Sequence, residues 1–205
     1  VMRKAGDIIP EVVRVIKHTG EPVYRLPTHC PSCGEVVIRE EDEADLRCVN
    51  PACPAQRLRN LIHFTSKDAM DMDGLGPAVL EKLVQENRIT YAYDLYTLSI
   101  EDICELEGFQ QKSAENVVRA VENSKSNDLY RVIYGLGIRH IGEKAAKLLA
   151  QHFGSMEAVM KASVEEVEAI DGFGQVMAQS VVSFFALEPS RVLVQKLQEA
   201  GVNMT

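Results

Sequence analysis

The chain has 205 residues, of which 46% are apolar and 25% are charged, and its formal net charge is −8 at pH 7. We expect a globular protein with one or two modest hydrophobic cores. No apolar run approaches the length of a membrane span and no signal peptide opens the sequence, which excludes a membrane-spanning class and makes a cytoplasmic location the expectation.

The first segment, residues 1–26, has strand-like character in "VMRKAGDIIPEVVRVIK". The chain begins with Val1 and enters this strand-like run directly. We therefore expect a piece of a longer protein.

Residues 27–55 contain four cysteines in two pairs. Cys30 and Cys33 have two residues between them, fourteen residues follow, and Cys48 and Cys53 have four between them. Clustered thiols in such a chain favour a metal, and four thiolates suit tetrahedral Zn²⁺, with a rubredoxin-like iron site and disulfides as the alternatives. Because four cysteines leave no open position for water, we expect a structural zinc on which the folding of this segment depends.

The sequence predicts a basic connecting helix at residues 56–72, and "AQRLRNLIHFTSKDAM" covers most of this range. Its apolar residues share one helix face, and three basic residues lie elsewhere: Arg57, Arg59 and Lys67. Two interpretations stay open, a polar face on a packed helix and direct contact with phosphate.

A glycine–apolar–glycine pattern recurs in residues 73–205. Its four triplets begin at residues 74, 108, 140 and 172, at intervals of 34, 32 and 32 residues. Apolar residues at helical spacing follow each triplet, and helical stretches opened by Ser99 and Ser163 precede two of them. The near-constant interval indicates a repeated helix–hairpin–helix unit, and hence a mainly α fold.

Each hairpin is expected to bind a phosphate. Its glycines tolerate positive φ and let a partner approach the backbone, while N–H groups at the start of the second helix attract an anion. The alternative is an ordinary corner in which glycine ends a helix. Gln110 and His140 replace glycine in hairpins two and three, so the phosphate-binding geometry of both stays open.

Charge is unevenly placed in this part of the chain. Residues 66–205 carry thirteen Lys and Arg against twenty-one Asp and Glu, yet bases flank hairpin three, including Lys147 on the helix after it. The Debye length is about 8 Å at physiological salt, so a local basic rim outweighs distant acids, although a merely solubilising charge distribution is the alternative. We expect hairpin three to bind most strongly. The candidate DNA-binding residues are Gly74, Gly76, Gly108, Lys112, Arg139, His140, Gly142, Lys144, Gly172 and Gly174.

Nearly all of the sequence resembles the C-terminal half of bacterial NAD-dependent DNA ligases. "RKAGDIIPEVV" is similar to the end of that family's OB-fold domain, and "HCPSCG" with "CVNPACPAQ" to its four-cysteine zinc finger. "AMDMDGLG", "LEGFQQKSAENVV", "LGIRHIGEKAA" and "GFGQVMAQSVVSFF" are similar to its four helix-hairpin-helix motifs. The resemblance implies an OB-fold remnant at 1–26, a zinc finger at 27–55, a connecting helix at 56–72 and a helix-hairpin-helix domain at 73–205.

The family joins the 5′-phosphate to the 3′-hydroxyl at nicks in duplex DNA, in replication and repair, using NAD⁺ and Mg²⁺. The resemblance implies that the helix-hairpin-helix domain meets the minor-groove side of the duplex in the bacterial nucleoid. No Lys-x-Asp-Gly motif occurs in the sequence. We therefore expect the adenylation, N-terminal and BRCT domains to lie outside this chain, and the chain alone to hold no catalytic residue.

Two other function classes are compatible with parts of the sequence. One is a free-standing DNA-binding or repair-scaffold protein without catalysis, which an upstream reading frame encoding a nucleotidyl-transfer domain would exclude. The other is a metal-dependent nuclease using Asp71 and Asp73, which is disfavoured because these acids only lead into a hairpin.

Overall fold

The computed structural model describes residues 1–6, 9–17, 20, 22, 25–39, 45–48, 50 and 53–205. The chain divides into two compact units, Val1–Val49 and Asn50–Thr205. The predicted segments 1–26 and 27–55 include positions outside the described residues, and the segment limits at 26, 55 and 72 stay predictions.

The first unit contains two short antiparallel ladders. Strand β1 (Met2–Ala5) pairs with β2 (Ile9–Val12), and β3 (Val37–Ile38) pairs with β4 (Arg47–Cys48). The strand character predicted at the start of the sequence is confirmed. All four residues of β2 are exposed, and Cys30 is the only buried side chain among the residues described in this unit. These short ladders therefore lack a hydrophobic core of their own within the described residues.

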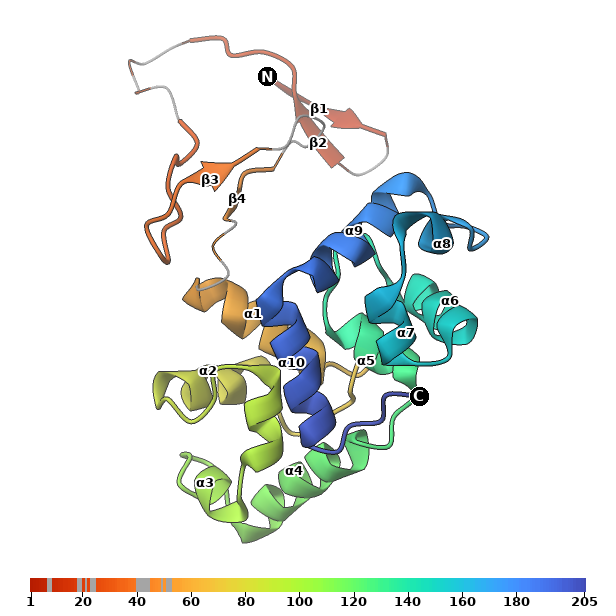
Figure 1. The fold of residues 1–205 in the computed structure, drawn as a ribbon. Helices are drawn as coiled ribbons and strands as arrows, with labels where there is room; N and C mark the ends of the chain where they lie inside the picture. The colour runs from red at the N-terminus through yellow and green to blue at the C-terminus, as the bar shows by residue number, and fades with distance from the viewer. Residues whose placement is uncertain are drawn as a thin grey trace. The chain divides into compact units, whose positions relative to one another are not determined.

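The second unit is helical (Figure 1). Its helices in chain order are α1 (Pro54–Thr65), α2 (Pro77–Gln85), the 3₁₀ helix η1 (Ala92–Thr97), α3 (Ile100–Cys104), α4 (Gln111–Ser124), α5 (Leu129–Gly135), α6 (Glu143–Phe153), α7 (Met156–Lys161), α8 (Val164–Glu168), α9 (Gln175–Ala186) and α10 (Glu188–Glu199). The mainly α fold predicted for this part of the chain is confirmed.

Apolar residues at helical spacing build one core through this unit. On α4, for example, Ala114, Val117 and Val121 are buried, which places one stripe of the helix inward. Each buried side chain of this size stabilises the fold by roughly 1.5–3 kcal/mol relative to exposure, less for alanine. The core thus fixes the helices that carry the hairpins.

Serine caps begin two of the short helices, as the sequence predicts. The Ser99 hydroxyl accepts the N–H of Asp102 at 3.1 Å, and the Ser163 hydroxyl accepts the N–H of Glu166 at 3.2 Å. The Asp102 and Glu166 carboxylates accept the serine N–H groups in return, at 2.9 and 2.8 Å. These reciprocal bonds satisfy N–H groups that have no partner within their own helix.

The last residues of the chain form hydrogen bonds with distant segments of the helical unit. The Asn203 N–H donates to the carbonyl of Lys125 at 2.8 Å, and its side-chain amide donates to Asn127 at 3.2 Å. The Met156 N–H donates to the carbonyl of Met204 at 2.9 Å. Hairpins one and two are therefore tied to hairpins three and four by the connection between α4 and α5 and by this C-terminal segment.

Candidate nucleic-acid interface and metal centre

Four turns in the helical unit share one hydrogen bond. In each turn the N–H of the apolar middle residue donates to the carbonyl three residues earlier, at 2.9 to 3.2 Å. The four donor and acceptor pairs are Leu75 to Met72, Phe109 to Leu106, Ile141 to Ile138, and Phe173 to Ile170. The helices α2, α4, α6 and α9 begin directly after these turns. The four positions singled out in the sequence therefore have the same local structure.

The first residue of every turn has positive φ. The value is 88° at Gly74 and Gly172, 93° at Gly108 and 62° at His140. Histidine is among the residues that enter the left-handed region most readily after glycine. Hairpin three therefore keeps the same turn although it lacks the first glycine.

The third residue of each turn is in an extended conformation instead. Its φ is −71° at Gly76, −123° at Gln110, −83° at Gly142 and −111° at Gly174. The expectation that both glycines need positive φ is therefore wrong for this position, because any residue can adopt such a backbone. A Cβ atom at Gly76, Gly142 or Gly174 would meet nothing within 4 Å. These glycines thus leave open space in front of the backbone, where another molecule can approach.

Hairpin two differs from the other three in its N–H groups. The Gln110 N–H donates to the Ser113 hydroxyl at 2.9 Å, which in turn donates to the Gln110 carbonyl at 2.8 Å. In contrast, the N–H groups of Gly76, Gly142 and Gly174 have no acceptor within the described part of the chain. Hairpin two therefore offers one donor fewer. The serine three residues after Gln110 is a sequence signal for this capping box that the sequence analysis missed.

Two lysines occupy equivalent places after hairpins two and three. Lys112 and Lys144 are the second residues of α4 and α6, both are exposed, and neither forms an ion pair with the residues described. Ala78 and Val176 hold this place on α2 and α9, and Val176 is 65% exposed. Charge along the sequence does not reveal this equivalence, because it depends on where each helix begins.

The other cations near hairpin three are placed differently. Lys147 bonds to Glu143 at 2.5 Å, and its ammonium lies 4.7 Å from the centroid of the Tyr130 ring. The hydrogen bond to Glu143 raises the pKa of Lys147 above its ordinary value. Arg139 is exposed and interacts within the chain. Lys144 is therefore the cation at this hairpin that is available to an external anion.

The four cysteines predicted as metal ligands come together. The sulfur atoms of Cys30, Cys33, Cys48 and Cys53 all lie within 4.8 Å of one another, and Cys33 and Cys48 are 3.5 Å apart. Zn–S bonds of about 2.3 Å in a tetrahedron place the sulfurs about 3.8 Å apart, so the set fits Zn²⁺ with small adjustments. Hydrogen bonds from the backbone N–H groups of Ser32 and Cys33 lower the pKa of the Cys30 thiol, which favours the thiolate that a metal binds. All five cysteines are free of disulfides.

Comparison with known proteins identifies the family. Residues 29–55 match the NAD-dependent DNA ligase C4 zinc finger domain. Residues 66–123 match the SAM-like helix-hairpin-helix tandem, and residues 131–194 match the helix-hairpin-helix motif. The DNA ligases of Bacillus cereus (strain ATCC 10987) and Bacillus thuringiensis (strain Al Hakam) are each 52% identical to this chain over 208 residues, which cover all of it. The chain is homologous to the C-terminal region of DNA ligase.

The chain spans 31% of the length of these DNA ligases. It carries the zinc finger and helix-hairpin-helix segments, which indicate the DNA-binding part of the ligase. The family resemblance expected from the sequence is therefore confirmed. The two matched segments also divide the four turns into pairs, with hairpins one and two in residues 66–123 and hairpins three and four in residues 131–194.

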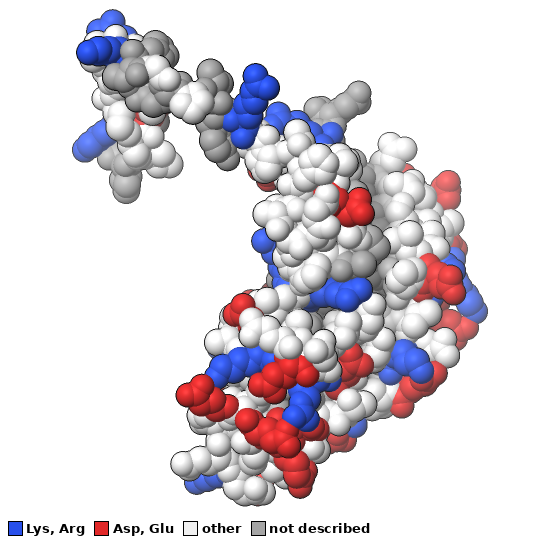
Figure 2. All heavy atoms as spheres, turned by 90° about the vertical axis from the view of Figure 1, so that its left-hand side faces the viewer, with Lys and Arg blue, Asp and Glu red and all other residues white. Residues whose placement is uncertain are grey.

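Several acidic residues of this region form ion pairs with lysine or arginine side chains. Figure 2 shows acidic side chains interspersed with basic ones on one face of the helical unit, most densely in its lower part. Several are tied to Arg88, which bonds to Asp102 at 2.7 Å and also to Glu105. The Ser99 hydroxyl and N–H lower the pKa of Asp102, and Arg88 adds to this effect. Part of the acidity of the sequence is therefore neutralised within the chain.

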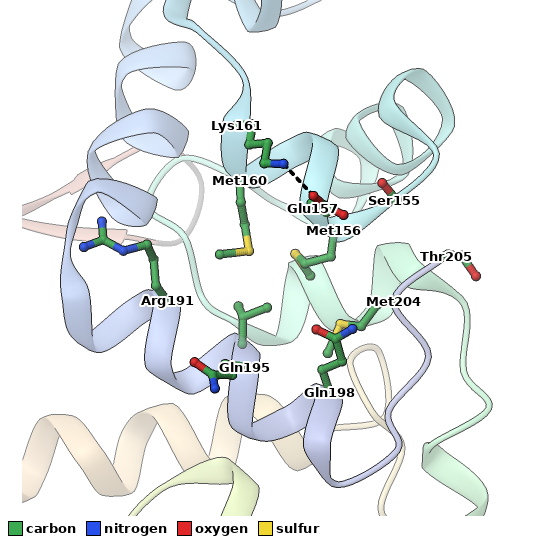
Figure 3. Close-up of a pocket in the computed structure, with 11 residues that line it drawn as sticks. Ser155, Met156, Glu157, Met160, Lys161, Arg191, Gln195, Gln198, Met204 and Thr205 are labelled. Carbon is green, nitrogen blue, oxygen red and sulfur yellow. Dashed lines mark hydrogen bonds and ion pairs between the residues drawn. The ribbon is translucent and has the colours of Figure 1, made fainter.

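A groove between α7 and α10 offers apolar surface, and the two cations that line it are engaged within the chain (Figure 3). Met156, Met160 and Met204 line it, and its volume is about 470 Å³. At its rim Lys161 is paired with Glu157, while Arg191 donates to the carbonyls that end α9, at 3.0 and 2.6 Å. This apolar groove therefore differs in character from the four turns. None of the described helices has the length and apolar character needed to cross a bilayer.

Proposed function

We propose that this chain grips nicked duplex DNA for an NAD-dependent DNA ligase that joins the 5′-phosphate to the 3′-hydroxyl in replication and repair. The observation that carries the proposal is the repeated turn whose N–H groups, at Gly76, Gly142 and Gly174, have no acceptor among the described residues, and whose glycines leave open space where a side chain would stand. Such groups at helix starts bind phosphate through their hydrogens and the helix dipole. Backbone N–H groups that bind phosphate do not distinguish one base from another, so binding is independent of the DNA sequence.

The hairpins contribute unequally to this grip. Hairpin three combines the His140 turn, the open N–H of Gly142 and the unpaired Lys144, and it is the strongest. Hairpin two keeps Gly108 and Lys112 but loses the Gln110 donor to Ser113. Hairpins one and four, with Gly74 and Gly172 at their first positions, act through backbone geometry alone, and Arg139 adds positive potential beside hairpin three. The surface so formed meets the minor-groove side of the duplex.

The zinc bound by the four cysteines is structural. Cys30, Cys33, Cys48 and Cys53 supply four sulfurs, which leave no position for water, so the metal stabilises the fold and takes no part in chemistry. NAD⁺ and Mg²⁺ serve the adenylation and sealing steps in domains of the full-length ligase beyond this chain. The enzyme acts on the DNA of the bacterial cytoplasm.

Two measurements test the proposal. This chain is titrated with nicked duplexes of unrelated sequence, and equal affinities are expected. The full-length ligase carrying Gly142→Val is then assayed for nick sealing against its parent, and a rise in the DNA concentration needed for half-maximal rate is expected. Absence of duplex binding by the chain excludes the DNA grip, and a full-length protein that takes no AMP from NAD⁺ favours a free-standing DNA-binding protein instead.

A further inference from the structure

Helix α1 carries cations that the four hairpins do not use. Arg57 and Arg59 lie on this helix and form no ion pair with the described residues. Many other cations of the helical unit are engaged with carboxylates, namely Lys82, Arg88, Lys125, Lys147, Lys161 and Lys196. Arg57 and Arg59 have no such carboxylate among the described residues, as Lys112 and Lys144 have none.

Arg57 is held in place by aromatic rings. Its guanidinium carbon lies 5.4 Å from the ring centroid of Tyr91, the residue directly before η1. Tyr91 stacks on Tyr93 with ring centroids 5.4 Å apart and an interplanar angle of 22°. Stacking of this kind fixes a guanidinium while leaving its hydrogen-bonding edges unused.

The nitrogen atoms of Arg57 lack acceptors. Nε is the only buried side-chain polar atom in the described residues with no hydrogen-bond partner. Among the described residues the two Nη atoms have no partner either, and they are not buried, so solvent reaches them. Asp94, the acid of η1, forms no ion pair with Arg57, and one of its oxygens accepts the N–H groups of Thr90 and Tyr91 at 2.8 and 2.9 Å. A charged donor held by packing without an acceptor is arranged for an anion from another molecule.

We propose that Arg57, supported by Tyr91, binds a phosphodiester of the DNA backbone at a site outside the four hairpins. The inference rests on the proposed DNA grip, which supplies the anion. A planar guanidinium matches two oxygens of a phosphate at once, which an ammonium cannot do. Arg59 lies two residues further along α1, is exposed and has no ring against it among the described contacts, so it provides a matched comparison.

The test is a titration of a fluorescent nicked duplex with this chain and three variants at several salt concentrations. Arg57→Met keeps the apolar stem and removes the charge. It is expected to weaken binding about five- to tenfold and to lower the slope of log affinity against log salt by about one. Arg57→Lys keeps the slope and loses part of the affinity, whereas Arg59→Met stays within about twofold of the parent. The proposed site is overturned if Arg57→Met binds with the affinity and salt slope of the parent. It is also overturned if Arg59→Met weakens binding as much as Arg57→Met does.

A second measurement uses only the parent chain and does not depend on whether a variant folds. Phenylglyoxal modification of the parent chain, read by mass spectrometry, is expected to slow at Arg57 by at least about threefold with saturating duplex and to stay unchanged at Arg59. Unchanged modification of Arg57 overturns the proposal. If the parent binds duplex and Gly142→Val weakens it while both Arg57 measurements are negative, only this site fails. If the parent does not bind duplex, the proposed function fails as well.

Discussion

A Cβ atom added to Gly74 would lie 2.6 Å from Cγ2 of Val117. Gly74 is the first residue of hairpin one, with φ of 88°, and Val117 is a core residue of α4 that is 2% exposed. Hairpin one therefore packs directly against the second helix of hairpin two. Two separate demands, positive φ and the absence of a side chain, meet at this glycine.

Gly74→Ala is expected to destabilise the chain more than Gly172→Ala. Both residues have φ of 88°, which costs an alanine about 1 kcal/mol. The Gly74 variant must also displace Val117, at a further cost of roughly 1–3 kcal/mol, whereas a Cβ at Gly172 meets nothing within 4 Å. Urea unfolding of both variants measures the difference. Equal losses of stability would show that α4 moves aside freely.

Lys144→Met is expected to weaken duplex binding about three- to tenfold, and Lys147→Met less than twofold. Both lysines lie on α6 after hairpin three, but Lys147 is held by Glu143 and Tyr130. Only Lys144 is free to release a counterion on meeting a phosphate. Titrations at fixed salt compare the two, and a larger effect of Lys147→Met would contradict the assignment.

Gly142→Val is expected to leave the stability of the chain nearly unchanged and to weaken duplex binding more than any other single change at the hairpins. Its φ of −83° suits valine and no protein atom lies within 4 Å, so the new side chain instead fills the space in front of the open N–H groups. Calorimetry and binding titrations separate these effects. If the folded variant bound duplex as tightly as the parent, hairpin three would be a structural turn and not a phosphate site.

Removal of zinc is expected to unfold the first unit and leave the helical core. Cys30 is the only buried side chain among the described residues of that unit, so its folding free energy comes largely from the metal. Native mass spectrometry should find one zinc per chain. A strong chelator or Cys48→Ser should abolish ordered NMR signals from residues near β3 and β4 while those of α4 to α10 persist. Persistence of both sets would contradict a structural zinc.

Acid is expected to weaken the start of α3. The pKa of Asp102 is lowered in the folded chain by Ser99 and Arg88, so its contribution to stability is complete above the ordinary pKa of about 4 and is lost as the pH falls through the lower folded value. Ser99→Ala should cost about 1 kcal/mol at pH 7 and should reduce the pH dependence of stability below about pH 4. Urea unfolding at intervals of roughly one pH unit between pH 2 and pH 7 measures both effects. An unchanged acid slope in Ser99→Ala would mean that Arg88 alone lowers the pKa.

The sequence by itself determined the features that depend on neighbours along the chain. The spacing of four cysteines predicted the cluster, and the glycine triplets predicted four turns at the positions where they occur. Ser99 and Ser163 predicted helix starts, because a cap and the N–H that it accepts are three residues apart. Local geometry is largely fixed by such short-range contacts.

Only the tertiary structure decided which of these groups are available to a partner. Val117 stands far along the chain from Gly74, and Tyr91 stands far from Arg57, so no local pattern could pair them. The extended third position of each turn followed from the backbone path and not from the glycine pattern. Among the described residues Lys147 is paired and Lys144 is not. This difference depends on what packs around α6, including Tyr130 of α5. Availability of a charge or a donor is set by three-dimensional neighbours, which spacing along the sequence does not specify.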